Sequence, residues 1–392
     1  MDFTLTAAQH AIVERAAALA REALAPRAAV YDRTGTYPRE SWHELWRQGF
    51  LAAAIPAEYG GMGLDMLSYV LALEQLSQGC TNSAMTLHMH SVVQMYIDVL
   101  ATPAQKACFY AEVVEHGKLF GSWGSEPARR GGANVGGTVI APVDGHHVIT
   151  GEKHFCTMAG AAHRYMVHCA VQGVESPHNL QLALVLHDNP GLRITGEWDT
   201  LGMRATVSPS VTLVDCAVPD DQLLGGPGEA LRSGVGLAFG LGYAAIYVGA
   251  AQRALEFTAD FCKTHRFEPD PETRAHNPVV QRHVAEMVMA LEAARLVVYQ
   301  AASRWAESDA VRRALLAARA KYLATEAASM VTGKAVQIVG GRSAHRALPL
   351  ERLFRDVRTA TLMPPSLDRS AEIIGKAALS IDDDLLLSRH AG

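Results

Sequence analysis

TVIAPVDGHHVITGEKHFCTMAG, residues 138–160, is the segment from which the fold class of this chain follows. Its first half places Asp144-Gly145 between two runs rich in β-branched residues, which is the pattern of a tight β-hairpin. Its second half puts Phe155 and Thr157 two residues apart, and alternate residues of a strand point to the same side. The segment therefore predicts β structure in the middle of the chain.

Two later segments extend the β signal. LALVLHDNPGLRITG, residues 182–196, places Asn189-Pro190-Gly191 between two apolar runs, as in a turn between strands. SVTLVDCAVP, residues 210–219, has the composition of a further strand. We therefore expect a small antiparallel β-barrel domain over residues 119–222.

Helical signals surround this central domain. Thr6 and Gln9 have the spacing of a capping box at a helix start. Asn277 followed by Pro278 is typical of another helix start, and Gly340-Gly341 is typical of a helix stop. We expect an N-terminal helical domain over residues 1–118 and a C-terminal four-helix bundle over residues 223–392, which makes the chain mostly α with a central β domain.

The composition narrows the possible functions. The 392 residues are 49% hydrophobic and 19% charged with a formal net charge of -5, and no run of Lys or Arg indicates a nucleic-acid partner. No apolar run reaches the ~18 residues of a membrane span, and the N-terminus is not typical of a signal peptide, so we expect a cytoplasmic protein. The six cysteines form no CxxC pair, which favours buried free thiols over disulfides or a zinc site.

Two histidines are the first candidates for catalysis. His88 and His90 lie two residues apart in an apolar helical segment, so they face different sides of the helix and are not expected to share a metal. Hydrogen-bonded histidines beside the core are the simpler explanation. An imidazole nevertheless titrates near neutrality, so either residue stays a candidate for proton chemistry. No metal site is expected.

Two segments are candidates for a ligand site. GSWGSEPARRGGANVGG, residues 121–137, has small and hydroxylated residues that let a planar ligand approach the backbone, although a plain surface loop has the same composition. In GEKHFCTMAG, residues 151–160, an aromatic ring and a hydroxyl share one side of the predicted strand, although a buried Phe155 and a hydrogen-bonded Thr157 would give the same pattern. For each segment taken alone, the plain structural interpretation is favoured over a ligand site.

Five segments taken together, in this order, resemble the acyl-CoA dehydrogenase superfamily. The first, IPAEYGGMGLDMLSYVLALEQLSQGC, is similar to the family's N-terminal helical block, and residues 121–137 resemble its flavin-binding TEPGAGSD strand and loop. GEKHFCTMAGAAHRYMV is similar to its GxKxWITNG strand, and LGMRATVSPSVTLVDCAVPDDQLLG resembles the strands that leave the β domain. AVQIVGGRSAHRALPLERLFRDVRT is similar to AVQIFGGNGY…RDA. The likeness covers nearly the whole chain.

The resemblance implies FAD, or less often FMN, held between the β domain and the helical bundle. The residues at matching positions are Ser122, Gly124 and Ser125 along the ring edge, Phe155 and Thr157 beside the ring, Arg266 near the pyrophosphate, and Gln337, Gly340, Gly341 and Ser366 in the C-terminal domain. The segment from Gln337 to Gly341 matches the one that reaches the FAD of the partner subunit. A homodimer or homotetramer is therefore implied.

One position departs from the family pattern. In typical family dehydrogenases a glutamate removes the proton next to the thioester carbonyl, and its usual position is Pro364 here, while an alternative position falls near Phe239. Proline carries no titratable group, and a positioned base contributes about 10²–10⁴ in rate. A base would have to come from elsewhere, and His90, His88 and Tyr243 are the candidates.

Three functions remain open. The first is an FAD-dependent oxidoreductase acting on an acyl thioester or a related substrate, with an electron-transferring flavoprotein as the partner that the resemblance implies. The second is a flavin-dependent monooxygenase or N-hydroxylase of the same fold, using oxygen and a flavin reductase. It accounts for the missing glutamate, although the histidine that many such members carry just before it is Met363 here. The third is a catalytically silent flavin-binding protein, which leaves the cofactor-facing segments unexplained.

Overall fold

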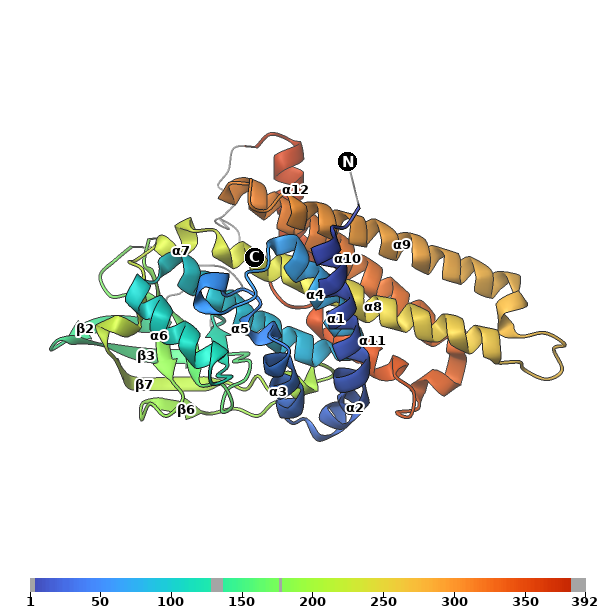
Figure 1. The fold of residues 1–392 in the computed structure, drawn as a ribbon, viewed down its shortest axis with the longest axis horizontal. Coiled ribbons are helices and arrows are strands. Elements are labelled where there is room, and N and C mark those ends of the chain that lie inside the picture. The colour runs from blue at the N-terminus through green and yellow to red at the C-terminus, as the bar shows by residue number, and fades with distance from the viewer. Residues whose placement is uncertain (1–3, 128–136, 176–177, 382–392) are drawn as a thin grey trace.

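The computed structural model describes residues 4–127, 137–175 and 178–381 (Figure 1). The strands lie at one end of the molecule. Three long helices, α8 (Ala238–Thr264), α9 (Pro278–Ser303) and α10 (Ala310–Val339), extend to the other end. The chain is mostly helical with a central β domain, as predicted.

From residue 4 onward, the N-terminal region contains six α-helices, which lie between these two ends. Its entry helix begins with the predicted capping box, in which Thr6 and Gln9 each bond the other's backbone N–H. A short π-helical segment, Ala20–Leu24, connects the first two helices. The innermost helix is α5, whose residues 81–94 are all buried. The helices are α1 (Ala7–Leu19), α2 (Ala25–Thr34), α3 (Arg39–Arg47), α4 (Met66–Gly79), α5 (Thr81–Leu100) and α6 (Pro103–Val114).

Within the described residues, eight strands form one sheet in the order β6-β7-β3-β2-β4-β5-β8, with β1 paired to β4 outside this path. The sheet is mixed, because β1 and β2 both run parallel to β4, so the prediction of an antiparallel domain was wrong for these two pairings. The β2–β3 hairpin separates β1 from β4 along the chain, and such a long connection lets two strands run in the same direction. The strands are β1 (Phe120–Trp123), β2 (Val139–Val143), β3 (His146–Lys153), β4 (Arg164–Val171), β5 (Leu180–Leu186), β6 (Leu192–Ile194), β7 (Val211–Val218) and β8 (Leu223–Leu224).

The predicted turns of the β domain form. Asp144 and Gly145 connect β2 to β3 with φ values of 44° and 82°, the signs that a type I′ hairpin turn requires. Asn189-Pro190-Gly191 lies between β5 and β6, and residues 210–219 contain β7. The strands begin at Phe120 and end at Leu224. The domain limits 1–118, 119–222 and 223–392 stay predictions.

The C-terminal region is built around α10, which packs against α8, α9, α11 (Leu350–Ala360) and α12 (Leu367–Ala378). A short helix, α7 (Glu229–Arg232), precedes α8 along the chain. Asn277 caps α9 by accepting from the N–H groups of Val279 and Val280, with Pro278 in the first turn, as predicted. The predicted end of a helix at Gly340-Gly341 is confirmed, since α10 ends just before Gly340. The helical bundle is confirmed.

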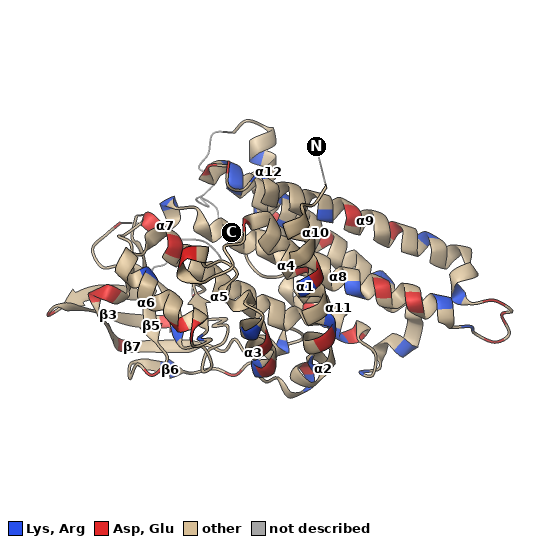
Figure 2. Cartoon of the chain, in the orientation of Figure 1, with Lys and Arg blue, Asp and Glu red and all other residues tan. Residues whose placement is uncertain are grey.

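One helical segment, Val235–Thr264, is long and apolar enough to cross a membrane by length and composition, which differs from the sequence-based expectation. Its most apolar window is 78% buried inside the protein. Charged side chains of both signs lie along the outer helix α9, whereas α8 carries none before Arg253 (Figure 2). A helix that is apolar on all sides and mostly buried is typical of the centre of a helical bundle. The six cysteines are free and five of them are buried, as expected.

A buried carboxyl group joins the three regions. Asp356 of α11 accepts hydrogen bonds from Asn82 Nδ2 of α5 at 3.0 Å and from the N–H of Met203 in the β domain at 2.6 Å. Asn82 in turn accepts from the N–H of Ala205 at 3.0 Å. Burial raises the pKa of Asp356 to about 6, and the N–H of Met203 opposes this shift. The junction is therefore sensitive to the protonation of one side chain.

We expect Asp356→Asn to remove part of the pH dependence of stability. The pKa rises from 3.8 to about 6 on folding, so the stabilisation from this group is full below about pH 4 and is lost as pH rises through 6. The expected loss is on the order of 2–3 kcal/mol. Urea unfolding of both proteins between pH 4 and pH 7 measures it, with the exposed Asp188→Asn as control. A constant difference between wild type and Asp356→Asn across this range would contradict the assignment.

Candidate functional site

The segments that follow β1 and β3 meet at one edge of the β domain. Ser122 is buried on β1, and Gly124 and Ser125 follow this strand. The N–H of His154 donates to the carbonyl of Ser125 at 2.9 Å. Three predicted cofactor residues are thereby placed beside the segment that carries Phe155.

Phe155 projects into solvent from a strained backbone. Its φ is +56°, a conformation that is a genuine outlier for a bulky residue, and its side chain is 64% exposed. The ring packs edge to face with the rings of Trp198 and His154, at 6.3 Å between centroids in each pair. Such outliers persist where surrounding contacts hold them, and they cluster at functional sites. An exposed ring held in this way suits a flat aromatic ligand, so the residues present fit the flavin that the sequence predicts.

Thr157 does not share the orientation of Phe155. Strand β3 ends at Lys153, so both residues lie in a turn, and the prediction that they share one side of a strand was wrong. Thr157 is buried, its hydroxyl accepts from Ser208 Oγ at 3.1 Å, and its carbonyl accepts from Trp123 Nε1 at 3.2 Å. The left-handed residue at position 155 breaks the alternation that a strand would impose.

A buried ion pair fastens the glycine-rich segment. Lys153 Nζ lies 2.8 Å from Glu126 Oε1, and the side chains are 0% and 4% exposed. Glu126 also accepts from the N–H groups of Gly137 at 2.9 Å and Thr138 at 3.0 Å. Burial alone raises the pKa of Glu126, but the Lys153 ammonium and the two N–H groups outweigh it and lower the pKa. Residues 128–136 of the predicted flavin segment lie outside the described residues, and Glu126 ties together the chain on either side of them.

The turn at the family's glutamate position packs against α8. A Cβ on Gly240 would lie 3.7 Å from Pro365 Cδ, which places the turn next to the start of that helix. Ser366 is the N-cap of α12, and its Oγ accepts from the N–H of Arg369 at 3.1 Å. Met363 to Ser366 contain no titratable side chain. The turn itself therefore offers no proton acceptor.

His88 is wedged between α4 and α8. Its Nε2 lies 3.1 Å from the carbonyl oxygen of Phe239, and its Nδ1 lies 2.9 Å from Tyr69 Oη. A carbonyl oxygen only accepts, so Nε2 carries the proton and Nδ1 accepts from the tyrosine. The ring occupies space that a side chain at Gly242 would need, since a Cβ there would lie 2.1 Å from His88 Cε1. Burial lowers the pKa of His88 to about 4, so the ring is neutral at pH 7.

His90 faces the other side of α5, as its spacing predicts. Its Nδ1 accepts from the N–H of Phe120 at 2.9 Å, and its Nε2 lies 3.1 Å from the carbonyl of Leu51. Burial lowers the pKa of His90 to about 4 and raises the pKa of Tyr243, whose hydroxyl donates to Met89 Sδ at 3.4 Å. All three candidate bases are neutral and hydrogen-bonded in this state. Their catalytic assignment stays a prediction.

The remaining predicted cofactor residues lie at the end of the bundle away from the strands (Figure 1). Gln337 is exposed in the last turn of α10, and a Cβ on Gly340 or Gly341 would meet nothing within 4 Å. Arg266 lies in the loop after α8 and pairs with Glu268. One chain therefore does not bring this group together with Ser122 and Phe155. The resemblance implied this separation, because it assigns Gln337 to Gly341 to the partner's cofactor.

The sequence analysis missed Lys321. This residue of α10 is fully buried, and its ammonium has no hydrogen-bond partner among the described residues. It lies 5.5 Å from the ring centroid of Tyr247, whose hydroxyl donates to the carbonyl of Ala360 just before the turn at Met363. Burial lowers the pKa of Lys321 to about 8. The sequence does contain a sign of this burial: Lys321 follows Ala317 by four residues, which places it on the same apolar face of the helix.

Comparison with known protein families gives three matches in order along the chain. The acyl-CoA dehydrogenase N-terminal domain matches residues 6–116, the middle domain matches residues 122–216, and the C-terminal domain matches residues 241–379. The three matches coincide with the N-terminal helices, the sheet and the C-terminal bundle. They follow the predicted order of the three regions.

Individual proteins show the same likeness. The probable acyl-CoA dehydrogenase YngJ of Bacillus subtilis is 30% identical over 365 residues, which cover 91% of this chain and 94% of that protein. The structure of butyryl-CoA dehydrogenase from Megasphaera elsdenii superposes with a TM-score of 0.87 at 28% identity, covering 97% of this chain and all of that one. The dibenzothiophene monooxygenase TdsC from Paenibacillus sp. A11-2 superposes with a TM-score of 0.85 at 26% identity, with the same coverage.

Proposed function

Because this chain belongs to the acyl-CoA dehydrogenase family, we propose that it oxidises an acyl-CoA thioester. The cofactor is a flavin, with FAD as the proposed form and FMN as the alternative. The observation that carries the proposal is the edge where Ser122 to Ser125 meet the exposed ring of Phe155. A bound flavin supplies two-electron redox chemistry there.

The residues of this edge have separate tasks in the proposal. Phe155 covers one part of the flat cofactor, and the small residues Gly124 and Ser125 let the backbone approach its edge. Glu126 and Lys153 hold this segment in place from below the surface. Gln337, Gly340 and Gly341 are too far from this edge in the same chain, so we propose a homodimer or homotetramer in which they serve the neighbouring cofactor.

The proton acceptor is proposed to lie outside the Met363–Ser366 turn. His88 is the candidate nearest to the family's alternative base position, since its Nε2 bonds the carbonyl of Phe239. The His88 ring also packs edge to face against the rings of Phe239 and Tyr243, with centroids 6.0 Å and 5.3 Å away. The three rings form an aromatic cluster at the start of α8. Proton uptake at Nδ1 requires the hydrogen bond from Tyr69 to break, which favours a slow reaction.

We expect anaerobic addition of butyryl-CoA to the flavin-loaded protein to bleach the flavin absorbance band. The bleaching rate should be about 10²–10⁴ lower than in a relative that has a positioned glutamate. Pro364→Glu should raise this rate, because it adds a carboxylate at the turn, whereas Pro364→Gln has a side chain of the same length and should not. Longer acyl-CoA thioesters in the same assay define the chain length. No bleaching with any thioester, in wild type and in Pro364→Glu, would contradict the dehydrogenase proposal.

A monooxygenase is the second candidate. It is supported by the likeness to TdsC and by the absence of a titratable group in the turn. Oxygen consumption that depends on an organic substrate and on a flavin reductase, without thioester bleaching, would favour it. For the dehydrogenase, an electron-transferring flavoprotein is the proposed electron acceptor, and a cytoplasmic location is proposed for both functions.

A further inference from the structure

The turn at residues 155–158 rests on the loop at residues 202–209 of the β domain. Two N–H groups of the turn reach three carbonyl oxygens of the loop, at 3.0 and 3.1 Å. In addition, Ser208 Oγ donates to the hydroxyl of Thr157 at 3.1 Å. The loop therefore fixes the position of the two residues of the turn, Phe155 and Thr157, that the resemblance places beside the flavin ring.

The same loop is strained and is pressed against α11. Met203 and Val207 have φ values of +56° and +40°, and a left-handed backbone is a genuine outlier for a β-branched residue such as Val207. Gly202 lies so close to α11 that a Cβ there would be 2.2 Å from the carbonyl oxygen of Arg355. Such a backbone persists only where the surrounding contacts fix it. Loss of one contact therefore allows the loop to relax.

Asp356 of α11 supplies two of these contacts. Its carboxylate accepts from the N–H of Met203 at 2.6 Å and from Asn82 Nδ2 at 3.0 Å, and Asn82 Oδ1 accepts from the N–H of Ala205 at 3.0 Å. Both hydrogen bonds of the carboxylate thus lead to the loop. When the carboxyl is protonated, one of the two N–H donors faces an O–H group instead of a free acceptor. Whichever bond weakens, the loop loses a contact.

The charges around Asp356 are largely compensated. The titratable groups close to it are Asp32 of α2, Arg352 and Arg355 of α11, and the thiol of Cys80. Arg355 bonds both carboxylate oxygens of Asp32, at 3.0 and 2.7 Å, and burial raises the pKa of the Cys80 thiol, which keeps it neutral. Burial raises the pKa of Asp356 to about 6, so this buried group changes its charge near neutral pH.

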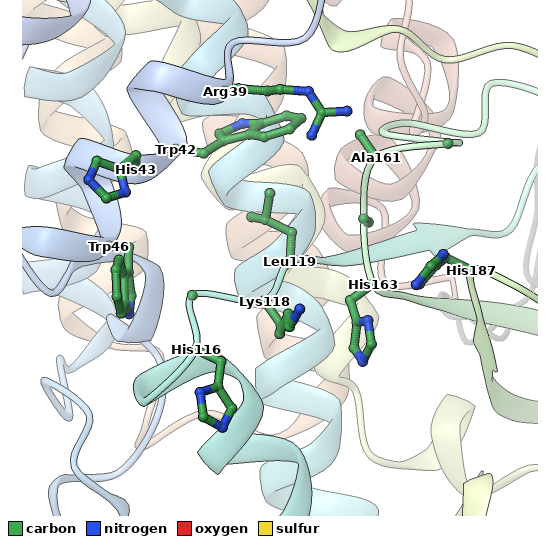
Figure 3. Close-up of a pocket in the computed structure, with 13 residues that line it drawn as sticks. Arg39, Trp42, His43, Trp46, His116, Lys118, Leu119, Ala161, His163 and His187 are labelled. Carbon is green, nitrogen blue, oxygen red and sulfur yellow. The ribbon is translucent and has the colours of Figure 1, made fainter.

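Other groups that titrate in the β domain are separate from this junction. A hollow of about 400 Å³ between α3 and the β domain is lined by four histidines, His43, His116, His163 and His187 (Figure 3). None of its lining residues lies in the loop 202–209 or forms a hydrogen bond with Asp356 in the described structure. His154 is the histidine beside the proposed flavin edge, because its ring packs against Phe155.

We propose that Asp356 is a positioning residue for the flavin, which acts through the loop 202–209 on the hydroxyl of Thr157. The ionised carboxylate holds the loop, and with it Phe155 and Thr157, in place at the flavin edge. Thr157 Oγ1 accepts from Ser208 and donates to no described residue, so its hydrogen is available to the flavin. This role rests on the flavin site of the proposed function and adds to it a residue of α11.

The test follows the visible absorbance of the bound flavin between pH 4 and pH 7, with free flavin in the same buffers as the baseline. We expect the spectrum of the wild type to change with a midpoint near pH 6. Asp356→Asn should keep the low-pH spectrum of the wild type at every pH. The reason is that an amide, like a protonated carboxyl group, presents both a donor and an acceptor.

Variants of Ser208 separate this positioning from stability. Ser208→Ala removes the hydroxyl that bonds Thr157 and leaves the contacts of Asp356 in place. It should weaken the spectral change several-fold but keep the pH dependence of the free energy of unfolding that Asp356→Asn loses. Ser208→Thr retains a hydroxyl and should restore the spectral change. The control is Thr195→Ala, which removes a hydroxyl from an exposed pair in the same domain and should alter neither property.

Several results would overturn the proposal. These are a wild-type spectrum that does not depend on pH, the same change in Asp356→Asn, or an undiminished change in Ser208→Ala. A change that disappears in His154→Gln and persists in Asp356→Asn would assign the titration to His154 and also overturn it. A wild type that binds no flavin would contradict the proposed function itself, whereas bound flavin with a constant spectrum contradicts only the role of Asp356.

Discussion

Lys153→Met is expected to lower the free energy of unfolding by about 3–5 kcal/mol. The substitution removes the ammonium that lies 2.8 Å from Glu126 and leaves a carboxylate that is only 4% exposed. The N–H groups of Gly137 and Thr138 still bond this carboxylate, but a neutral N–H group does not replace the positive charge of the ammonium. Urea unfolding followed by circular dichroism measures the loss. Flavin affinity should fall as well, because the same pair holds the segment that follows Ser125.

Two further variants identify the buried pair as the cause. Glu126→Gln/Lys153→Met should be more stable than Lys153→Met alone, because it removes the buried negative charge that Lys153 no longer faces and keeps an acceptor for the two N–H groups. Lys106→Met breaks a pair whose side chains are 21% and 43% exposed, and it should change stability by about 0–1 kcal/mol. If Lys153→Met costs no more than Lys106→Met, the pair does not stabilise the fold as argued.

Gly242→Ala is expected to lower the free energy of unfolding by about 3 kcal/mol. The added Cβ would lie 2.1–2.5 Å from three atoms of the His88 ring, closer than any relaxed contact. The ring cannot move away freely, because Tyr69 and the carbonyl of Phe239 hold both of its nitrogens. This cost exceeds the intrinsic preference of a helix for alanine over glycine, which favours the variant by about 0.5–1 kcal/mol. Thermal or urea unfolding gives the difference.

The control lies on another helix of the same bundle. Gly333 is within α10, and a Cβ there would meet nothing within 4 Å, so Gly333→Ala should stabilise the protein by about 0.5–1 kcal/mol. His88→Ala should then relieve the clash, and the effects of His88→Ala and Gly242→Ala should be strongly non-additive. Equal effects of alanine at positions 242 and 333 would refute the close packing of His88 on α8.

Local features were predictable because short-range chemistry controls them. The capping box at Thr6 and the Asp144-Gly145 turn depend on residues within a few positions of each other, and both form as predicted. The end of helix α10 at Val339 follows in the same way from the glycine at position 340. The parallel pairing of β1 with β4 was not predictable, since strands that are distant in the chain choose partners through the packing of the whole domain.

The candidate site shows the same division. The family motifs predict cofactor contacts for Ser122, Phe155 and Gln337, whereas the strand pattern wrongly predicted that Phe155 and Thr157 share one side of a strand. The structure instead buries Thr157 and exposes Phe155 on a left-handed turn. His88 and His90 were recognised as buried or catalytic alternatives, and only their partners on α4, α8, β1 and the loop at Leu51 show that both are neutral and fully bonded.

The sequence by itself indicated the family, the order helices–sheet–helices, the candidate flavin segments and the lack of an acid between Met363 and Ser366, because these depend on residue identity and local spacing. The tertiary structure was needed for the orientation of Phe155, for the buried Glu126–Lys153 pair, and for Lys321, whose ammonium has no hydrogen-bond partner among the described residues. Each of these depends on burial and on contacts between residues far apart in the chain, and a linear pattern of residue types does not contain those contacts.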